Sequence, residues 1–208
     1  MASSIIHICV ASEINKKLNK KIDDILIGSI APDIAKHLGK SKLESHFLDN
    51  LEEDLPNIEK FYNKYKNHFN NDFVLGYYIH LYTDYLWIKL FLPDFYNGEY
   101  IYKLDGTIEK IDNNEKTKYI YNDYTNLNIT LIDEYDLDLK IFYNEVPKFD
   151  EIIEEIPMNK LPVIVNAASV IIKNALENKT NYVFDKDIIN KFINFSTDII
   201  LQDILRKL

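Results

Sequence analysis

The chain has 208 residues, a formal net charge of −9 at pH 7 and a single cysteine, Cys9. The length suits one domain with a substantial core, so we expect residues 1–208 to form a single domain. The acidic balance argues against a broad surface for double-stranded nucleic acid or anionic membranes, and one cysteine excludes an internal disulfide.

Helical periodicity dominates the chain. An apolar segment at 23–33 stops at Pro32 and Asp33, and Asp72 is a candidate N-cap for a helix that stops near Pro93. Pro56 suits the first turn of another helix. The predicted helices are 5–18, 45–51, 56–69, 73–92, 119–135, 149–156, 161–176 and 185–205. The sequence therefore predicts an all-α, multi-helix bundle.

A small excursion interrupts this pattern near 96–118. The segment contains Gly98, the pair Asp105-Gly106 and a polar run with some alternation of apolar residues. Both a β-hairpin and an irregular exposed loop are compatible with these features.

The stretch GYYIHLYTDYLW at 76–87 carries His80 and Asp84 in a strongly apolar setting. Burying even a neutral polar group without a partner costs about 2–7 kcal/mol, so both side chains need compensation. Residues four apart lie on the same face of a helix. The spacing suits a shared metal ion, and it equally suits a hydrogen-bonded pair without metal.

Other polar residues also sit in apolar segments. His7 occurs in SIIHICVAS and His46 in ESHFLDN, while Asp33 follows a rigid Gly-Ser-Ile-Ala-Pro turn. With His80 and Asp84 they give three imidazoles and two carboxylates. This donor set suits zinc and is compatible with manganese or iron.

The segments IIHICVA, LIGSIAPDI, SHF and GYYIHLYTDYLW occur in this order within about the first 90 residues. In this respect the chain resembles the zinc-dependent phospholipase C family, whose fold is shared by single-strand-specific zinc nucleases. The resemblance implies an all-helical bundle with a metal cluster at the bottom of a cleft.

The resemblance also implies roles for individual residues. His7 is similar to the family's first histidine ligand, and Asp33 to the aspartate that bridges two metals and acts on the attacking water. His46, His80 and Asp84 are similar to the ligands of the metal across that bridge. Trinuclear members also use an N-terminal tryptophan and later histidines, which this sequence lacks. One or two zinc ions are therefore expected.

Several residues have competing interpretations. Asp123, with Asn126, could face the cleft, but we expect an exposed carboxylate because exposure is the usual state of Asp. His37 is either a further ligand or part of a solvated helix end, and His68 is expected to be structural in a helix's last turn. The tyrosines near 77–85 are expected to be core residues, with those flanking His80 and Asp84 at the cleft mouth. Cys9 is expected in the core.

Two functions follow as hypotheses. One is a metal-dependent hydrolase acting on a phospholipid head group, a nucleotide or a small phosphodiester through metal-activated water. The other is a metal-stabilised binding or scaffold protein with a non-catalytic site. A third hypothesis, which concerns the core and not the function, is that the polar residues are hydrogen-bonded to one another without metal. No window reaches the ~18 apolar residues of a membrane span, and no signal peptide is evident, which together predict a cytoplasmic protein. The oligomeric state is open.

Overall fold

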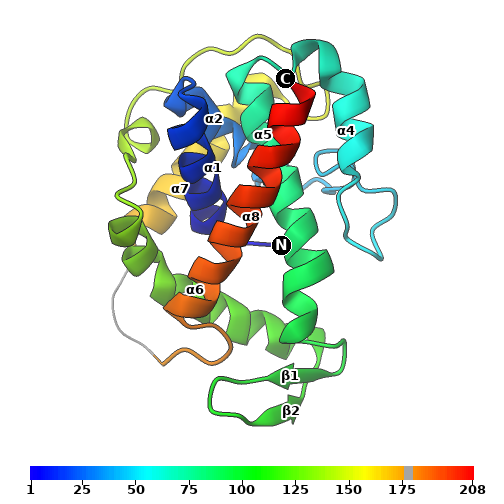
Figure 1. The fold of residues 1–208 in the computed structure, drawn as a ribbon, viewed down its shortest axis with the longest axis vertical. Coiled ribbons are helices and arrows are strands. Elements are labelled where there is room, and N and C mark those ends of the chain that lie inside the picture. Colours follow the sequence, from blue (N-terminus) through cyan, green and yellow to red (C-terminus); the bar gives the residue numbers. More distant parts are fainter. Residues whose placement is uncertain (176–179) are drawn as a thin grey trace.

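The computed structural model describes residues 1–175 and 180–208, and these are mostly helical (Figure 1). The all-α expectation is confirmed. The helices are α1 (Ser4–Leu18), α2 (Ile22–Gly28), α3 (Ile34–His37), α4 (Ile58–Tyr65), α5 (Asp72–Leu86), α6 (Asn113–Glu134), α7 (Leu161–Lys173) and α8 (Lys186–Lys207). Among the described helices, none combines the length and apolar character needed to cross a membrane.

Polar caps fix where the long helices begin. The side chain of Asn71 accepts hydrogen bonds from the first backbone N–H groups of α5, so Asn71 and not Asp72 is the N-cap. Asp112 and Glu115 form a reciprocal capping box at the start of α6. Asp185 caps α8. Each cap satisfies N–H groups that a helix leaves without partners.

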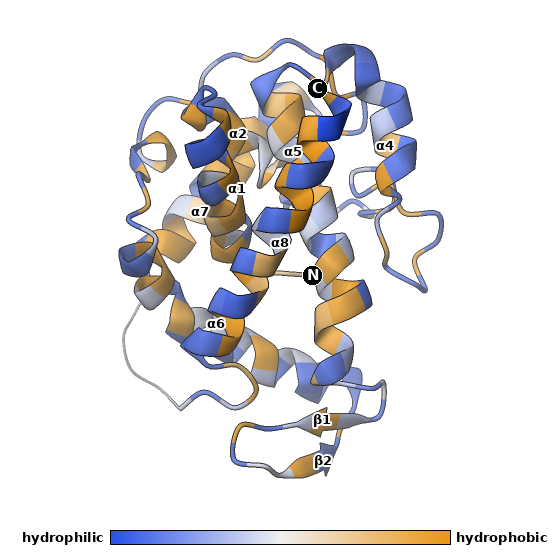
Figure 2. Ribbon diagram, viewed as in Figure 1, coloured by the Kyte–Doolittle hydropathy of each residue, from blue (hydrophilic) through white to orange (hydrophobic). Residues whose placement is uncertain are grey.

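The helices pack around one apolar core. Buried side chains from α1 to α8 belong to a single cluster, in which α1 and α5 are buried on nearly all sides. Figure 2 shows apolar residues along α1, α2 and α5, and mixed polar and apolar residues along α8. α5 therefore lies in the interior of the molecule, and any polar side chain on it needs a partner there.

A close approach between α2 and α5 depends on two glycines. A Cβ atom at Gly76 would lie 3.0 Å from the Cα of Gly28 and even closer to the carbonyl oxygen of Ile25. A Cβ atom at Gly28 would meet the backbone of α5 in the same way. Only glycine lets the two backbones come this near.

The excursion near 96–118 contains a β-hairpin (Figure 1). Strands β1 (Tyr100–Tyr102) and β2 (Ile108–Lys110) pair antiparallel, with Tyr100 opposite Lys110. Gly106 has φ +83° in the connecting turn, a conformation that favours glycine. The excursion is shorter than expected, because α6 begins at Asn113 and not near 119.

The predicted helix at 45–51 is wrong. Phe47 has φ 54°, which a right-handed helix does not allow, and Leu48 forms an isolated β-bridge with Pro56. Pro56 consequently precedes α4, whose N-cap is Asn57, instead of lying in the first helical turn. The segment is a loop that brings His46 inward.

The predicted helix at 149–156 is also wrong, because bends and turns replace it. Its apolar residues Ile153 and Ile156 still enter the core. The hydroxyl of Tyr65 accepts from the N–H of Glu154 and donates to the carboxylate of Glu155. Pro157 further disfavours helical geometry at the preceding residue. Side-chain contacts with α4 thus hold this segment.

The remaining helices differ mainly at their ends. α5 ends at Leu86 and continues as a π-helical turn, Trp87–Phe91, where the sequence predicted one helix to 92. α7 ends at Lys173, and the predicted end at 176 lies outside the described residues.

Candidate metal centre

All five candidate ligands lie close together although they come from four segments. His7 lies on α1, Asp33 ends the 3-10 turn Ala31–Asp33, and His46 lies in the loop after α3. His80 and Asp84 project from the same face of α5. Four of the five side chains are almost wholly buried, whereas the Asp33 side chain is 18% exposed.

Short distances connect these side chains. Nε2 of His80 lies 3.4 Å from Oδ2 of Asp84 and 3.3 Å from Nε2 of His46. Nε2 of His7 lies 3.3 Å from Oδ1 of Asp84, and Nε2 of His46 lies 3.6 Å from Oδ1 of Asp33. The rings of His7 and His80 are stacked with centroids 3.8 Å apart.

These residues form two groups whose ligand atoms lie near enough to hold a metal ion. One group is His7, His80 and Asp84, and the other is Asp33, His46 and His80. His80 belongs to both. The resemblance implied a different division, with Asp33 as the shared residue.

Unsatisfied polar atoms support a metal at this site. Within the part of the chain that the structure describes, both ring nitrogens of His7 and Oδ2 of Asp84 are buried without a hydrogen-bond partner. Nε2 of His7 and Oδ1 of Asp84 are close enough for a hydrogen bond by distance but do not meet its geometry. Leaving such atoms unpaired costs about 1–3 kcal/mol each. A divalent cation would satisfy one ring nitrogen of His7 and a carboxylate oxygen of Asp84, and the donor set fits zinc.

A second layer of contacts orients two of the imidazoles. Nδ1 of His80 lies 2.7 Å from the carbonyl oxygen of Ser29, so Nδ1 donates to that carbonyl and Nε2 faces the cluster. Nδ1 of His46 lies 3.0 Å from the hydroxyl oxygen of Ser45. Tyr77 in turn donates to the carbonyl of Ser45. Sequence reasoning missed both serines, because a contact such as that between Ser29 and His80 leaves no local signal.

The electrostatics keep the carboxylates ionised. Burial alone would raise the pKa of Asp84, but His7 and His80 hold it well below its usual value. Burial likewise opposes ionisation of Asp33, and His46 and His80 outweigh it, so the pKa of Asp33 is lowered. Burial and the neighbouring His80 lower the pKa of His7. Ionised carboxylates and a neutral imidazole are the forms that bind metal.

The first residues of the chain cover one side of the cluster. The N–H of Ala2 donates to Oδ1 of Asp84 at 2.8 Å, and the carbonyl of Met1 accepts from the hydroxyl of Tyr124 at 2.9 Å. Figure 1 shows the N-terminus beside α5, near the middle of the molecule. Asp33 therefore offers the more open side.

The other candidates lie away from the cluster. His37 and His68 are exposed, as expected for helix ends, and Cys9 is buried in the core.

The expectation that the tyrosines flanking His80 and Asp84 line the mouth of a cleft at the cluster is wrong. Tyr82 and Tyr85 line a separate pocket. Tyr82 lies two residues from both His80 and Asp84, and residues two apart on a helix point to nearly opposite sides.

Asp123 is buried, which corrects the expectation of an exposed carboxylate. Its two oxygens accept from the backbone N–H groups of Tyr182, Val183 and Phe184 at 2.9, 2.6 and 2.9 Å. Asn126 donates to the carbonyl of Thr180 nearby. Asp123 belongs to neither metal-competent group and instead anchors the segment that leads into α8.

We expect Asp123→Asn to lower the free energy of unfolding by about 3 kcal/mol, since a carboxylate that accepts several N–H groups is replaced by an amide with one acceptor. Chemical denaturation measures the loss. Asp133→Asn, at an exposed position of the same helix, is the matched control and should change little. Equal stability of the two variants would contradict the anchoring role.

Comparison with known proteins adds no assignment: no family model matches the chain, and neither the curated proteins nor the solved structures contain a significant match. The assignment of function therefore depends on the geometry and chemistry of the cluster.

Proposed function

We propose that this protein is a metal-dependent hydrolase that cleaves a phosphoester. The observation that carries the proposal is the exposure of Asp33. Its side chain is 18% exposed, while the other four members of the cluster are buried. Solvent and substrate would reach the cluster at this carboxylate. The resemblance to the zinc-dependent phospholipase C family assigns the water-directing role to the same residue.

Each residue has a defined part in this proposal. His7, Asp33, His46, His80 and Asp84 would hold one or two zinc ions, with manganese and iron as alternatives. When bound, such a cation lowers the pKa of a coordinated water toward neutrality and offsets charge on the phosphoryl group. Asp33 orients the attacking water. Its lowered pKa makes it a weak base, so orientation is its main contribution.

The substrate needs an exposed phosphoester, because Asp33 is the one cluster side chain that is more than about 1% exposed. A phospholipid head group, a nucleotide and a small phosphodiester each present one. On a chain of net charge −9, the bound cations would supply the local positive charge that attracts an anionic phosphate.

A second candidate function is a metal-stabilised binding or scaffold protein. The observation in its favour is the cover that the N-terminal residues provide, since Ala2 occupies an oxygen of Asp84. Structural metal sites are closed by protein ligands, whereas catalytic sites keep one position open. The two functions therefore differ in whether the cluster accepts an external molecule.

The test compares Asp33→Asn with wild type, each loaded with zinc, manganese or iron. Hydrolysis of bis(p-nitrophenyl) phosphate and of phosphatidylcholine vesicles gives the rates, and elemental mass spectrometry gives the metal content. We expect a roughly hundredfold lower rate with metal retained at least at the His7, His80 and Asp84 group, because the water loses its orienting group. Asp138→Asn, at a surface position, is the control and should match wild type.

Two results would count against this proposal, the first against catalysis and the second against the role of Asp33. Wild-type protein that holds metal but cleaves none of these phosphoesters would favour the scaffold function. An Asp33→Asn variant with full activity and full metal content would remove Asp33 from the mechanism.

A further inference from the structure

A pocket lies on the other side of α5 from the metal-competent cluster. Its volume is about 350 Å³, within the range of small-molecule sites. The loop before α4, the start of α4, α5 and the end of α8 form its walls. The lining residues are Asp49, Asn50, Glu53, Leu55, Pro56, Asn57, Ile58, Glu59, Tyr78, Tyr82, Tyr85 and Asp203. None of the five candidate metal ligands is among them, so this pocket is separate. We call it the tyrosine pocket.

Three tyrosines of α5 form one wall. The rings of Tyr78 and Tyr82 have centroids 5.8 Å apart at an interplanar angle of 80°, and those of Tyr82 and Tyr85 are 5.9 Å apart at 78°. Successive rings thus stand nearly perpendicular. Aromatic rings that line a cavity can attract an alkylammonium group through cation–π interaction.

Carboxylates also line the pocket, and that of Asp203 accepts a hydrogen bond from the hydroxyl of Tyr78. Asp49, Glu53, Glu59 and Asp203 line the tyrosine pocket, and no described lining residue is cationic. Outside the lining, Lys60 lies 3.3 Å from Asp49, and Lys207 lies 3.2 Å from Glu59 and 3.1 Å from Asp203. Two lysines against four carboxylates leave an excess of negative charge.

The chain's own Lys207 shows how these groups hold an ammonium. Its Nζ lies 4.7 Å from the ring centroid of Tyr62 and 6.0 Å from that of Tyr78, in addition to the two carboxylates. Burial alone would lower the pKa of Lys207, yet Asp203 and Glu59 raise it above its usual value. The edge of the tyrosine pocket therefore already stabilises an alkylammonium ion between aromatic rings and carboxylates.

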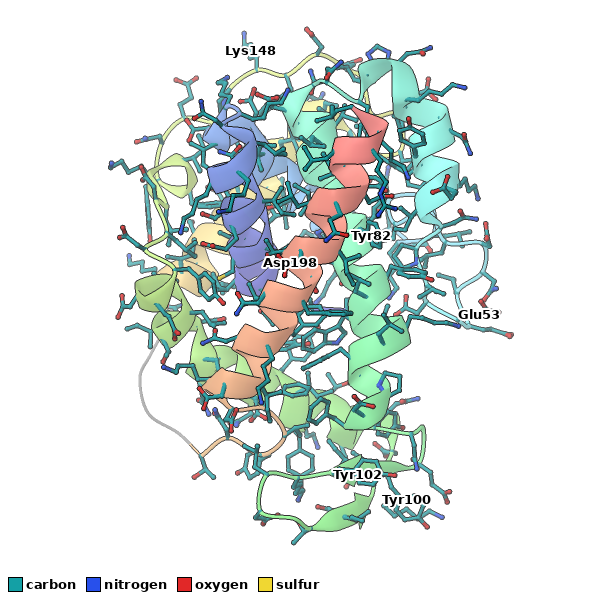
Figure 3. All side chains as sticks on the ribbon, in the orientation of Figure 1. Glu53, Tyr82, Tyr100, Tyr102, Lys148 and Asp198 are labelled. Atoms are coloured by element: carbon teal, nitrogen blue, oxygen red, sulfur yellow. The ribbon has the colours of Figure 1, made fainter. Side chains whose placement is uncertain are left out.

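The pocket favours an organic cation over a metal ion. A phenol oxygen is a weaker ligand for a metal ion than a carboxylate oxygen. Among the described residues, the four carboxylates of the pocket also do not form a group that could hold a metal ion. We propose that the tyrosine pocket binds an organic ammonium compound, with its cationic group against Tyr82 and Tyr85. Figure 3 labels Tyr82 on α5 and Glu53 on the loop at the other side of the pocket.

The experiment titrates the full chain with choline chloride and with spermidine by isothermal calorimetry. We expect saturable binding of at least one of them, weakened fivefold or more by Tyr82→Leu and retained within about threefold by Tyr82→Phe, which keeps the aromatic face. Glu53→Gln should also weaken binding. Glu52→Gln changes a neighbouring carboxylate outside the lining and should have no effect.

The outcomes distinguish the two possible ligands from each other and specific binding from nonspecific or absent binding. Binding of choline alone indicates a compact quaternary ammonium, and tyrosine-dependent binding of spermidine alone indicates an extended polyamine. Absence of binding for both, or binding that Tyr82→Leu leaves unchanged, would overturn the proposal. If magnesium at the same concentration of positive charge displaced the ligand equally well, the pocket would be a nonspecific acidic surface. This result would also overturn the proposal. Because metal-free protein serves for every titration, the result does not depend on the proposed hydrolase activity.

Discussion

Zinc should raise the melting temperature of metal-free protein by roughly 8–16 °C. Binding to the folded state alone contributes about 4 kcal/mol when free zinc exceeds its dissociation constant a thousandfold, and each kcal/mol shifts a chain of this size by about 2–4 °C. Zinc would give a partner to one unpaired nitrogen of His7 and to the carboxylate of Asp84. Differential scanning fluorimetry after chelation and zinc addition measures the shift.

The control for this prediction uses histidines inside and outside the cluster. In His80→Ala the zinc-dependent shift should largely disappear, because His80 belongs to both metal-competent groups. In His68→Ala, an exposed position, it should remain. The measured quantity is the difference with and without zinc, so a lower starting stability of His80→Ala does not confuse the result. A wild-type protein that zinc leaves unchanged would show that the cluster is compensated without metal.

Gly76→Ala should destabilise the protein by about 3 kcal/mol, near the upper end of overpacking effects. The added Cβ would meet the backbone of α2 at Ile25 and Gly28, and backbone atoms yield less than side-chain ends. Helix propensity acts in the opposite direction, since Gly→Ala in an unobstructed helix interior stabilises by about 1 kcal/mol. The sign of the change in the free energy of urea-induced unfolding therefore shows whether overpacking or helix propensity has the larger effect.

The same substitution should also weaken zinc binding. Gly76 lies one helical turn before His80, and separating α2 from α5 moves the carbonyl of Ser29 away from Nδ1 of His80. Thr125→Ala, on the exposed face of α6, is the control and should leave both stability and zinc binding near wild type. A stabilised Gly76→Ala variant would mean that the helices do not approach this closely.

The helical architecture was largely predictable because apolar periodicity and helix caps depend on short stretches of sequence. The helix at 5–18 was placed within one residue of its observed start, and its end at Leu18 is confirmed. The failures at 45–51 and 149–156 share one cause. Both segments carry apolar residues that enter the core, but Phe47 adopts positive φ and Glu155 is held by Tyr65. Neither constraint is visible in a local pattern.

The five candidate ligands could be named from the sequence because a polar side chain in an apolar segment requires a partner in the folded protein. Their role as ligands stays a prediction. The sequence alone did not place Asp123, because Asp is exposed in most settings and its backbone partners lie about 60 residues away.

What the sequence by itself determined is the helical class and the set of polar residues that need compensation, because both follow from residue type and spacing along the chain. Only the tertiary structure decided which residues meet. It brought His7 and His46 to His80, closed one side of the cluster with Ala2, and turned Tyr82 away toward a separate pocket. Contacts of this kind depend on how helices cross, and helix crossing is set by the whole core rather than by any one segment.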